Sequence, residues 1–499
     1  MEINSQKLIG NIHPVAYQTN PLNQANFYLD DVDDNIVYAE YDLNNQATIF
    51  TDINSKSFRA FLAKNITSHM NQRSINEYIQ AIHDHMIFER DQGKNVTCHV
   101  YKRFGYTNKH DRISINLKDL GRVLEINENG FRITKHSDIK FVSSNHMRSQ
   151  KTPKSCHDLD KYLRKHINLS DDDYIIFKCM LIQSFIPWHQ HYISVFRGEQ
   201  GCGKTELFKM MSKIIDPSYC AISSLSSNLE NTESYLSNVT FASFDNISYI
   251  DNETSKLLCL VATNGTTTKR KLYSNNEIVV NKYSNVIIAL NGITLSVRQN
   301  DLLSRCILFE PLPLTSENRK SQSILNDEFE SDLENILGAI CNILSEYLKV
   351  AKGFNITTQI DERMKETFDD MIIIASCMGI SEEQFVSIFE KSKQRKLNQL
   401  EAKTSNKRKD IILKTIIDLI DGKDSITDTA GDMHRKLCNT YPDFKANVSN
   451  AALFSKELHQ LIGVLSDNNI SIEFGTAHKK RSKVTIRKIQ SDPRISLVS

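Results

Sequence analysis

A glycine-rich segment, Gly198–Thr205, constrains the fold of this chain more than any other. It reads Gly-Glu-Gln-Gly-Cys-Gly-Lys-Thr and fits the pattern G-x-x-x-x-G-K-[ST] of a Walker A phosphate loop. The apolar run Tyr192–Phe196 before it predicts a strand, and the spacing of apolar residues in Glu206–Ile215 predicts a helix after it. This is the strand–loop–helix context that the motif requires, so a chance match in a glycine-containing loop is the weaker alternative.

The residue types of the loop suit the phosphates of a nucleotide. Its glycines let backbone N–H groups approach the phosphates without a Cβ in the way, and the helix N-terminus adds partial positive charge. Lys204 is expected to reach the β- and γ-phosphates, and the Thr205 hydroxyl to ligate Mg²⁺. The predicted cofactors are therefore ATP and Mg²⁺. The predicted nucleotide-binding residues are Gly198, Glu199, Gln200, Gly201, Cys202, Gly203, Lys204 and Thr205.

Further apolar segments follow the loop at α/β spacing. Val239–Phe244 predicts a strand that ends in Asp245, a Walker B pattern whose carboxylate would join Thr205 at the metal. A predicted strand over 285–290 ends in Asn291, and Arg305 precedes a last strand. Apolar strands separated by helices predict a parallel sheet. Between them, 268–280 predicts a hairpin whose first arm is basic, with Lys269, Arg270 and Lys271.

The order of these segments resembles the superfamily 3 helicases, an AAA+ ATPase class of viruses, phages and plasmids. It is most similar to poxvirus-type primase-helicases and related phage and mobile-element ATPases. The segments 244–248, 268–273 and 286–292 carry the likeness, which is good over 190–312 and loose over 96–490.

The resemblance implies a role for each polar position. Asn291 would position the attacking water, and Arg305 would be an arginine finger that reaches the ATP of a neighbouring subunit, usually in a hexameric ring. The basic hairpin would grip DNA in the pore of that ring. The resemblance thus implies four catalytic residues, namely Lys204, Asp245, Asn291 and Arg305.

One position departs from the family pattern. Many relatives carry a glutamate beside the Walker B aspartate, and this chain has Asn246 there. Hydrolysis would then be weak, or another carboxylate would serve. Glu199 and Glu310 are conceivable candidates.

The first 150 residues predict an α+β domain of helices followed by a β-meander. Residues 1 to about 55 are polar and acidic, and the cluster Asp30, Asp31, Asp33 and Asp34 is expected to be a solvated loop because the sequence predicts no apolar strands beside it. His83-Asp84-His85 is similar to a rolling-circle nuclease motif, but its surroundings predict a helix. From Val96 a period-two pattern predicts the meander.

The last hundred residues predict a winged-helix domain of three helices and a basic hairpin. The segment from Thr476 to Gln490 has six basic residues and no acidic one, which favours binding to duplex DNA phosphates over a solvated turn. The predicted contacts there are Lys479, Lys480, Arg481 and Lys483, in addition to Lys269, Arg270 and Lys271 in the pore. Residues 394–408 predict a linker.

The predicted fold class is a multidomain α/β chain with a central AAA+ P-loop domain on a parallel sheet, an α+β N-terminal domain and a C-terminal winged helix. The predicted boundaries are 1–150 for the N-terminal domain, 151–190 for a helical collar, 191–315 for the ATPase core, 316–400 for a helical bundle and 409–490 for the winged helix.

Composition adds mainly exclusions. The net charge of +1 points to no partner, so that only local clusters can. The ten cysteines include no C-x-x-C pair, which favours reduced thiols in a cytoplasmic protein over a disulfide scaffold or zinc site. No apolar run is long enough to span a membrane.

Three functions are compatible with these patterns. The first is an ATP-hydrolysing DNA helicase or replication initiator of a phage, satellite or other mobile element, acting as a homo-oligomer, with single-stranded DNA in the pore. The second is a DNA-binding ATP switch with weak hydrolysis, and the third is an ATPase of a phage-defence system. Asn246 favours the second slightly, and the basic hairpin favours the first.

Overall fold

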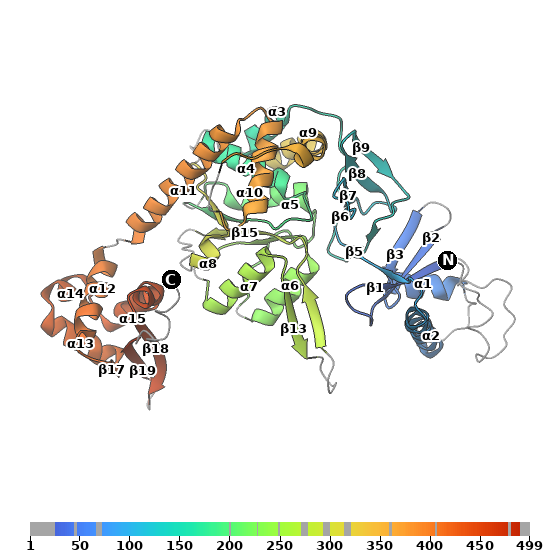
Figure 1. Ribbon diagram of the computed structural model, residues 1–499. Helices are drawn as coiled ribbons and strands as arrows, with labels where there is room; N and C mark the ends of the chain where they lie inside the picture. The colour runs from blue at the N-terminus through green and yellow to red at the C-terminus, as the bar shows by residue number, and fades with distance from the viewer. Residues whose placement is uncertain are drawn as a thin grey trace. The chain divides into compact units, whose positions relative to one another are not determined.

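In the computed structural model, four apolar segments form one parallel sheet, as predicted (Figure 1). Its strands, in spatial order, are β12 (Phe241–Phe244), β15 (Ile287–Gly292), β11 (Ile193–Arg197) and β16 (Cys306–Phe309). All four are rich in β-branched or aromatic residues, and almost all of their side chains are buried or half-buried. A parallel sheet must be covered on both faces, and this composition suits that position.

Successive side chains along each strand enter two different cores. Phe196 and Phe309 pack on one face, and Val195 and Leu290 pack on the other. The first face is covered by α4 (Asp171–Gln183), α5 (Lys204–Ile215), α9 (Gln322–Val350) and α10 (Lys365–Cys377). The second is covered by α6 (Leu229–Asn238) and α7 (Asn252–Ala262). The result is a three-layer α/β arrangement, and the predicted collar and bundle share the first core rather than standing apart.

Four short elements and one long helix complete this description. The short elements are α3 (Leu159–Leu163), η2 (Arg164–His166), α8 (Asn300–Leu303) and η4 (Ala351–Gly353), and the long helix is α11 (Glu382–Thr404). The predicted hairpin is present as β13 (Thr266–Arg270) paired antiparallel with β14 (Ile278–Lys282). Residues 394–404, predicted as part of a linker, instead continue α11. The composition of this segment is compatible with a helix as well as with a linker.

The β-meander is also present, as β6 (Phe104–Tyr106), β7 (Arg112–Asn116), β8 (Val123–Asn127) and β9 (Gly130–Thr134). Its apolar residues, such as Ile115 and Leu124, belong to the same core as α9 and the parallel sheet. The meander begins at Phe104 and not at Val96, where the period-two pattern starts. Residues 97–101 form β4 (Thr97–Cys98) and β5 (Val100–Tyr101), which pair in parallel with β1 (Ala25–Asp30) and β10 (Lys140–Phe141).

The expectation that no apolar strands flank the acidic cluster is wrong, although Asp31 and Asp34 of the cluster are exposed in a turn, as expected. Three strands precede the helices, namely β1, β2 (Val37–Leu43) and β3 (Ala47–Asp52), and α1 (Lys56–Asn65) and α2 (Gln72–Asp91) cover them. The acidic cluster is the turn between β1 and β2. Asp30 Oδ1 accepts hydrogen bonds from the N–H groups of Val32 and Asp33. Alternating tyrosines and charged residues concealed the buried face of these strands. His83 and His85 lie on α2, as predicted.

The C-terminal unit, residues 393–499, has its own hydrophobic core. Its helices are α12 (Lys407–Ile420), α13 (Ala430–Thr440), α14 (Pro442–Asn447), α15 (Ala451–Gln460) and α16 (Ile462–Asp467). Its antiparallel sheet has the order β17-β19-β18, formed by β17 (Ser425–Thr429), β18 (Ile470–Ala477) and β19 (Arg481–Lys488). Strand β17 was not predicted, because Ser-Ile-Thr-Asp-Thr carries little apolar signal.

The structure describes residues 25–43, 47–65, 72–198, 201–226, 228–247, 250–270, 278–292, 300–313, 321–358, 362–404, 407–477 and 481–489. Within these ranges, no helix combines the length and the apolar character that crossing a bilayer would need.

Candidate nucleotide site

The glycine-rich loop joins the carboxyl end of β11 to the first residue of α5, as the motif requires. Gly201 and Gly203 have φ angles of 84° and 87°, in the left-handed region that favours glycine. A Cβ on Gly198 would lie 3.2 Å from the Cys202 sulfur, so a side chain there would crowd the loop. The backbone path therefore accounts for all three glycines. Glu199 and Gln200 lie outside the described residues.

Helix α5 begins at Lys204 with an open N-terminus. Its N-cap is Gly203, which offers no side-chain hydrogen bond to the first turn. The first N–H groups of a helix have no partner within the helix, and together with the helix dipole they favour an anion. The Lys204 ammonium lies over the loop, where Nζ donates to the Gly198 carbonyl oxygen at 2.8 Å and lies 3.4 Å from the Cys202 sulfur. Backbone and side-chain donors thus surround one small space.

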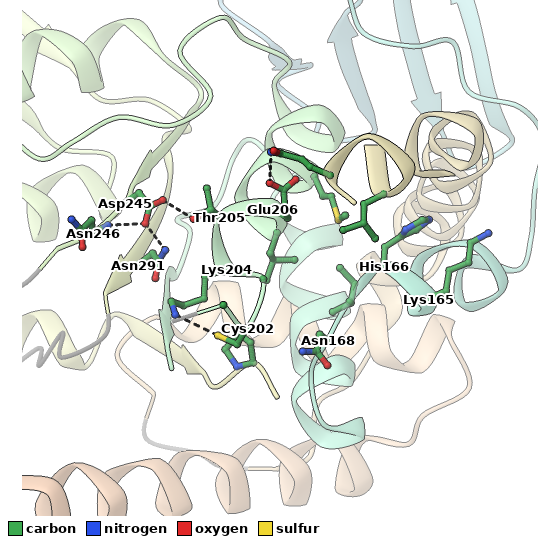
Figure 2. A pocket seen from close by; sticks show the side chains of 18 of the residues that line it. Lys165, His166, Asn168, Cys202, Lys204, Thr205, Glu206, Asp245, Asn246 and Asn291 are labelled. Atoms are coloured by element: carbon green, nitrogen blue, oxygen red, sulfur yellow. Dashed lines mark hydrogen bonds between the residues drawn. The ribbon is translucent and has the colours of Figure 1, made fainter. Parts of the chain in front are cut away.

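Asp245 is the centre of a polar cluster beside the loop (Figure 2). Its Oδ2 accepts a hydrogen bond from Thr205 Oγ1 at 2.8 Å, and its Oδ1 accepts one from Asn291 Nδ2. Strands β12, β15 and β11 are neighbours and run in parallel, so the residues at their carboxyl ends meet at one edge of the sheet. Thr205 follows the loop after β11, Asp245 follows β12, and Asn291 is near the carboxyl end of β15. The structure brings these three residues together, as the sequence pattern predicted.

Asn291 has an acceptor without a partner. The residue is only 3% exposed, and its Oδ1 forms no hydrogen bond within the described structure. An unsatisfied buried polar atom costs about 1–3 kcal/mol, so such atoms in native proteins commonly bind a ligand, an ion or water. Asn291 Oδ1 is therefore available to a ligand, and it lies beside the oxygens of Thr205 and Asp245. This set of oxygens has the chemistry that Mg²⁺ prefers.

Asn246 takes a left-handed conformation, with φ of 58°, directly after Asp245. Asparagine tolerates this region better than most residues do. Its N–H donates to Asp245 Oδ1 at 2.7 Å, and its side chain is exposed. Of the two alternative carboxylates, Glu310 forms an ion pair with Arg197 Nη2 at 2.8 Å, and Glu199 lies outside the described residues. Neither is identified as a base by this geometry.

A cavity of about 960 Å³ extends from this cluster to residues that the sequence did not single out. Lys165, His166 and Asn168 line its far side (Figure 2), together with Leu325 and Glu328 of α9. Lys165 and His166 contact the same carboxylate, since His166 Nε2 and Lys165 Nζ each lie 2.7 Å from Asp332 Oδ2. Burial opposes ionisation of Asp332, yet these two hydrogen bonds lower its pKa. A cavity of this size is typical of small-molecule and cofactor sites.

Arg305 does not join this cluster. It immediately precedes β16, and its carbonyl oxygen accepts the N–H of Ile193 at the start of β11, so it lies at the amino edge of the sheet. The residue is 8% exposed, and its guanidinium pairs with Asp301 at 2.9 Å. Within one chain, the predicted finger and the phosphate loop thus lie at opposite edges of the sheet.

The predicted DNA contacts are only partly described. Lys269 and Arg270 lie on β13, opposite Val279 and Ile278, and Lys271 lies outside the described residues. Arg481 and Lys483 lie on β19, where Lys483 is exposed, and Lys479 and Lys480 lie outside the described residues. Their role in binding DNA stays a prediction.

No group of three or more histidine, cysteine or carboxylate side chains suited to a metal occurs in the described parts of the chain. His189 and His191, which lie just before β11, both have protein partners. His189 Nδ1 lies 2.7 Å from Asp370, and His191 contacts Gln183 and Asn285.

One protein-family model matches part of the chain. Residues 168–375 match the family model described as actinomycete integrative conjugative element replication protein. No curated protein sequence matches the chain. Solved structures that are similar include the apo C-terminal region of NrS-1, with 13% identity and a TM-score of 0.40 over 94% of this chain and 96% of that chain. Another is the JCV helicase, with 16% identity and a TM-score of 0.23 over 47% and 65%. The matched family segment contains the phosphate loop, Asp245, Asn291 and Arg305.

Proposed function

We propose that the chain is an ATP-driven DNA motor that acts in replication of a mobile element, with the AAA+ organisation of superfamily 3 helicases. The observation that carries the proposal is the contact of Asp245 with both Thr205 and Asn291, beside the open N-terminus of α5. The similarity of 168–375 to a replication-protein family supports the biological context.

The residues of the site would bind the phosphates, hold the metal ion and orient the attacking water. The first turn of α5 and Lys204 would bind the β- and γ-phosphates and offset their charge. Thr205 and Asp245 would hold Mg²⁺, which supplies further charge neutralisation when it is bound. Asn291 is buried beside Asp245 with a free amide oxygen, so it suits the orientation of a water molecule toward the γ-phosphate.

The remaining parts would couple this site to DNA. In a ring of six subunits, Arg305 would reach the nucleotide of the adjacent subunit. The β13–β14 hairpin lies between α7 and β15 in the sequence, and β15 carries Asn291. The segment 283–286 that joins hairpin and β15 is short and mostly buried. The basic arm of the hairpin would grip single-stranded DNA, and the C-terminal unit would bind duplex DNA.

A DNA-binding ATP switch with weak hydrolysis is the second candidate. Asn246 favours it, because its exposed amide stands where relatives carry a glutamate and it cannot accept a proton from water. The two candidates differ in one measurable property, which is whether ATP turnover on forked DNA is fast enough to separate the strands.

The variant Lys204→Ala tests the shared part of both candidates. Loss of the ammonium is expected to lower ATP hydrolysis by about 10²-fold or more, because charge stabilisation of this kind contributes several kcal/mol to the transition state. The control is Lys256→Ala on α7, which removes an exposed ammonium that pairs with Glu253. Turnover by Lys204→Ala equal to that of the control would show that the loop is misassigned. Wild-type hydrolysis without unwinding of a fork would favour the switch.

A further inference from the structure

Two arginines converge on one carboxylate at the amino edge of the parallel sheet. Arg305 Nη1 lies 2.9 Å from Asp301 Oδ1, and Arg363 Nη1 lies 2.6 Å from the same oxygen. Arg305 precedes β16, and Arg363 lies one residue before Met364, the N-cap of α10. Residues 58 positions apart in the sequence thus bring two guanidinium groups to one carboxylate.

The three side chains differ in exposure. Arg305 is 8% exposed, whereas the side chains of Arg363 and Asp301 are 52% and 54% exposed. Moreover, the buried Arg305 Nε has no hydrogen-bond partner in the described structure. The cluster therefore has a fixed, buried member and an exposed member, and its open side faces solvent.

The cluster has an excess of positive charge and of donors. Each guanidinium carries five N–H donors and no acceptor, and Asp301 is one carboxylate. The hydrogen bond from Arg305 is the main reason that the pKa of Asp301 is lowered, so the carboxylate is ionised at neutral pH and the trio carries a net charge of +1. Paired guanidiniums bind carboxylate and phosphate oxygens in the same bidentate manner. Asp301 thus occupies a position that a phosphate would suit.

A phosphate bound on the loop of the same chain is out of reach. The five residues of β11 separate the two edges by about 16 Å at ~3.3 Å per residue. Neither arginine is among the residues that line the 960 Å³ cavity in the described part of the chain. A nucleotide that contacts this cluster must therefore be held by another copy.

We propose that Arg363 is a second trans-acting arginine, which together with Arg305 contacts the γ-phosphate of a nucleotide held by a neighbouring copy, where that phosphate replaces Asp301. This inference rests on the proposed ATPase function. Arg363 is the exposed member, so it reaches across the interface, and the buried Arg305 holds the inner side of the anion. Sequence reasoning named Arg305 alone, because nothing near Arg363 resembles a strand that borders the nucleotide site.

A mixing experiment with two inactive variants tests trans action. Arg363→Ala keeps its own phosphate loop, and Lys204→Ala keeps its arginines but has a defective loop. Each variant alone is expected to hydrolyse ATP at least tenfold more slowly than wild type. In an equal mixture, about one interface in four pairs an intact loop with an intact Arg363, so about a quarter of wild-type turnover is expected to return.

Two controls make the result specific. Lys365→Ala removes an exposed ammonium two residues away that pairs only with Asp369 among the described ion pairs, and it is expected to hydrolyse ATP like wild type. Arg363→Ala is expected to bind a fluorescent ATP analogue to its own loop, which shows that the variant is folded.

Two results would overturn the inference. If wild type hydrolyses ATP and the mixture stays as inactive as its components, or if Arg363→Ala alone is fully active, Arg363 has no role in trans and the cluster is a surface ion pair. If wild type itself neither binds nor hydrolyses ATP, the proposed function fails, and this inference fails with it.

Discussion

At the scale of single residues, two histidines before β11 illustrate how burial and charge compete. The His191 ring is buried between Gln183 and Asn285, and burial lowers its pKa to about 4. Burial also opposes the charged form of His189, but the hydrogen bond and charge of Asp370 prevail and raise its pKa above the usual value. Neighbouring side chains of the same type thus have opposite titration behaviour.

This difference predicts the pH dependence of stability. An unfolded histidine titrates near pH 6.5, so the contribution of His191 to the free energy of unfolding is complete above that pH and is lost as the pH falls toward 4. The loss amounts to about 2 kcal/mol at pH 5. His191→Gln is therefore expected to lose less stability than wild type between pH 7.5 and pH 5 in urea unfolding.

His189→Gln is the matched control and has the opposite sign. The raised pKa of His189 stabilises the fold below pH 6.5, and this contribution disappears as the pH rises through the folded value. Its removal should make the protein more sensitive to acid. Equal pH dependence in wild type and His191→Gln would contradict the neutral, buried state of His191.

The residues of the candidate site differ in how far the sequence could reveal them. Asp245 and Asn291 each follow an apolar strand, and parallel strands bring their ends together, so their meeting was predictable. Lys165 and His166 come from a short 3₁₀ turn without any periodic signal, and only the packing of α9 brings them to the cavity. The burial of Arg305 was not predictable either, because it depends on where Asp301 and α10 lie.

At the scale of secondary-structure elements, helix α9 is central to the larger hydrophobic core, because it packs with both the parallel sheet and the β-meander. It has 29 residues, and Leu333, Ile336, Ile340 and Leu344 lie in the core with the sheet and the meander. Next to it runs the irregular segment 151–155, where the Lys154 N–H donates to the Glu334 carbonyl oxygen at 2.9 Å. Such close approach of two backbones requires a residue without a side chain.

Gly338 provides that approach, and its replacement is expected to be strongly destabilising. A Cβ at this position would lie 1.5 Å from the Lys154 carbonyl oxygen, so one of the two backbones must move. Gly338→Ala is expected to lower the free energy of unfolding by about 3 kcal/mol or more, despite the better helix propensity of alanine. Thermal unfolding of the purified variant measures the effect.

Gly353→Ala is the control, since no atom lies within 4 Å of a Cβ built there. It is expected to change stability by about 0.5 kcal/mol or less. A Gly338→Ala variant as stable as this control would mean that α9 and 151–155 are not in close backbone contact.

Strands and helices could be predicted from the sequence where one or both of their faces carry apolar side chains. The four parallel strands and the last three strands of the meander, β7 to β9, have strong apolar patterns, and each was expected near its observed position. Short or polar strands were not, as β4, β5 and β17 show, because two to five residues carry too little periodicity. The helical extension of α11 was missed because its composition suits a linker equally well.

At the scale of the whole molecule, the division into two units separates the candidate nucleotide site from the C-terminal basic residues. All residues that line the 960 Å³ cavity belong to the first unit. The C-terminal unit has the order helix, strand, helices and two-stranded hairpin in α12, β17, α13 to α16, β18 and β19, so it has more helices than the three predicted, and the winged-helix assignment stays a prediction. It buries its own core, with Ile416, Phe444, Leu458 and Ile486 among its members.

This division predicts that nucleotide binding and duplex binding can be separated. A chain that ends at Thr404 retains every residue that lines the cavity, so it is expected to bind a fluorescent ATP analogue like the full chain. It lacks the basic residues of β19, so its affinity for duplex DNA at low salt is expected to fall by about tenfold or more. Equal duplex affinity of the two chains would place the duplex contacts elsewhere.

The exposed Lys483 allows a finer test of the same idea within the full chain. It lies on β19, opposite Thr429 and Gly475, and its loss is expected to weaken duplex binding for all sequences alike. If its ammonium contacts one phosphate, the slope of log affinity against log salt should fall by about one in Lys483→Ala. Lys414→Ala on α12 removes another exposed ammonium of the same unit and should leave the slope unchanged. A slope that is equal in all three proteins would show that β19 does not face DNA, and the basic hairpin would then be a solvated turn of the C-terminal unit.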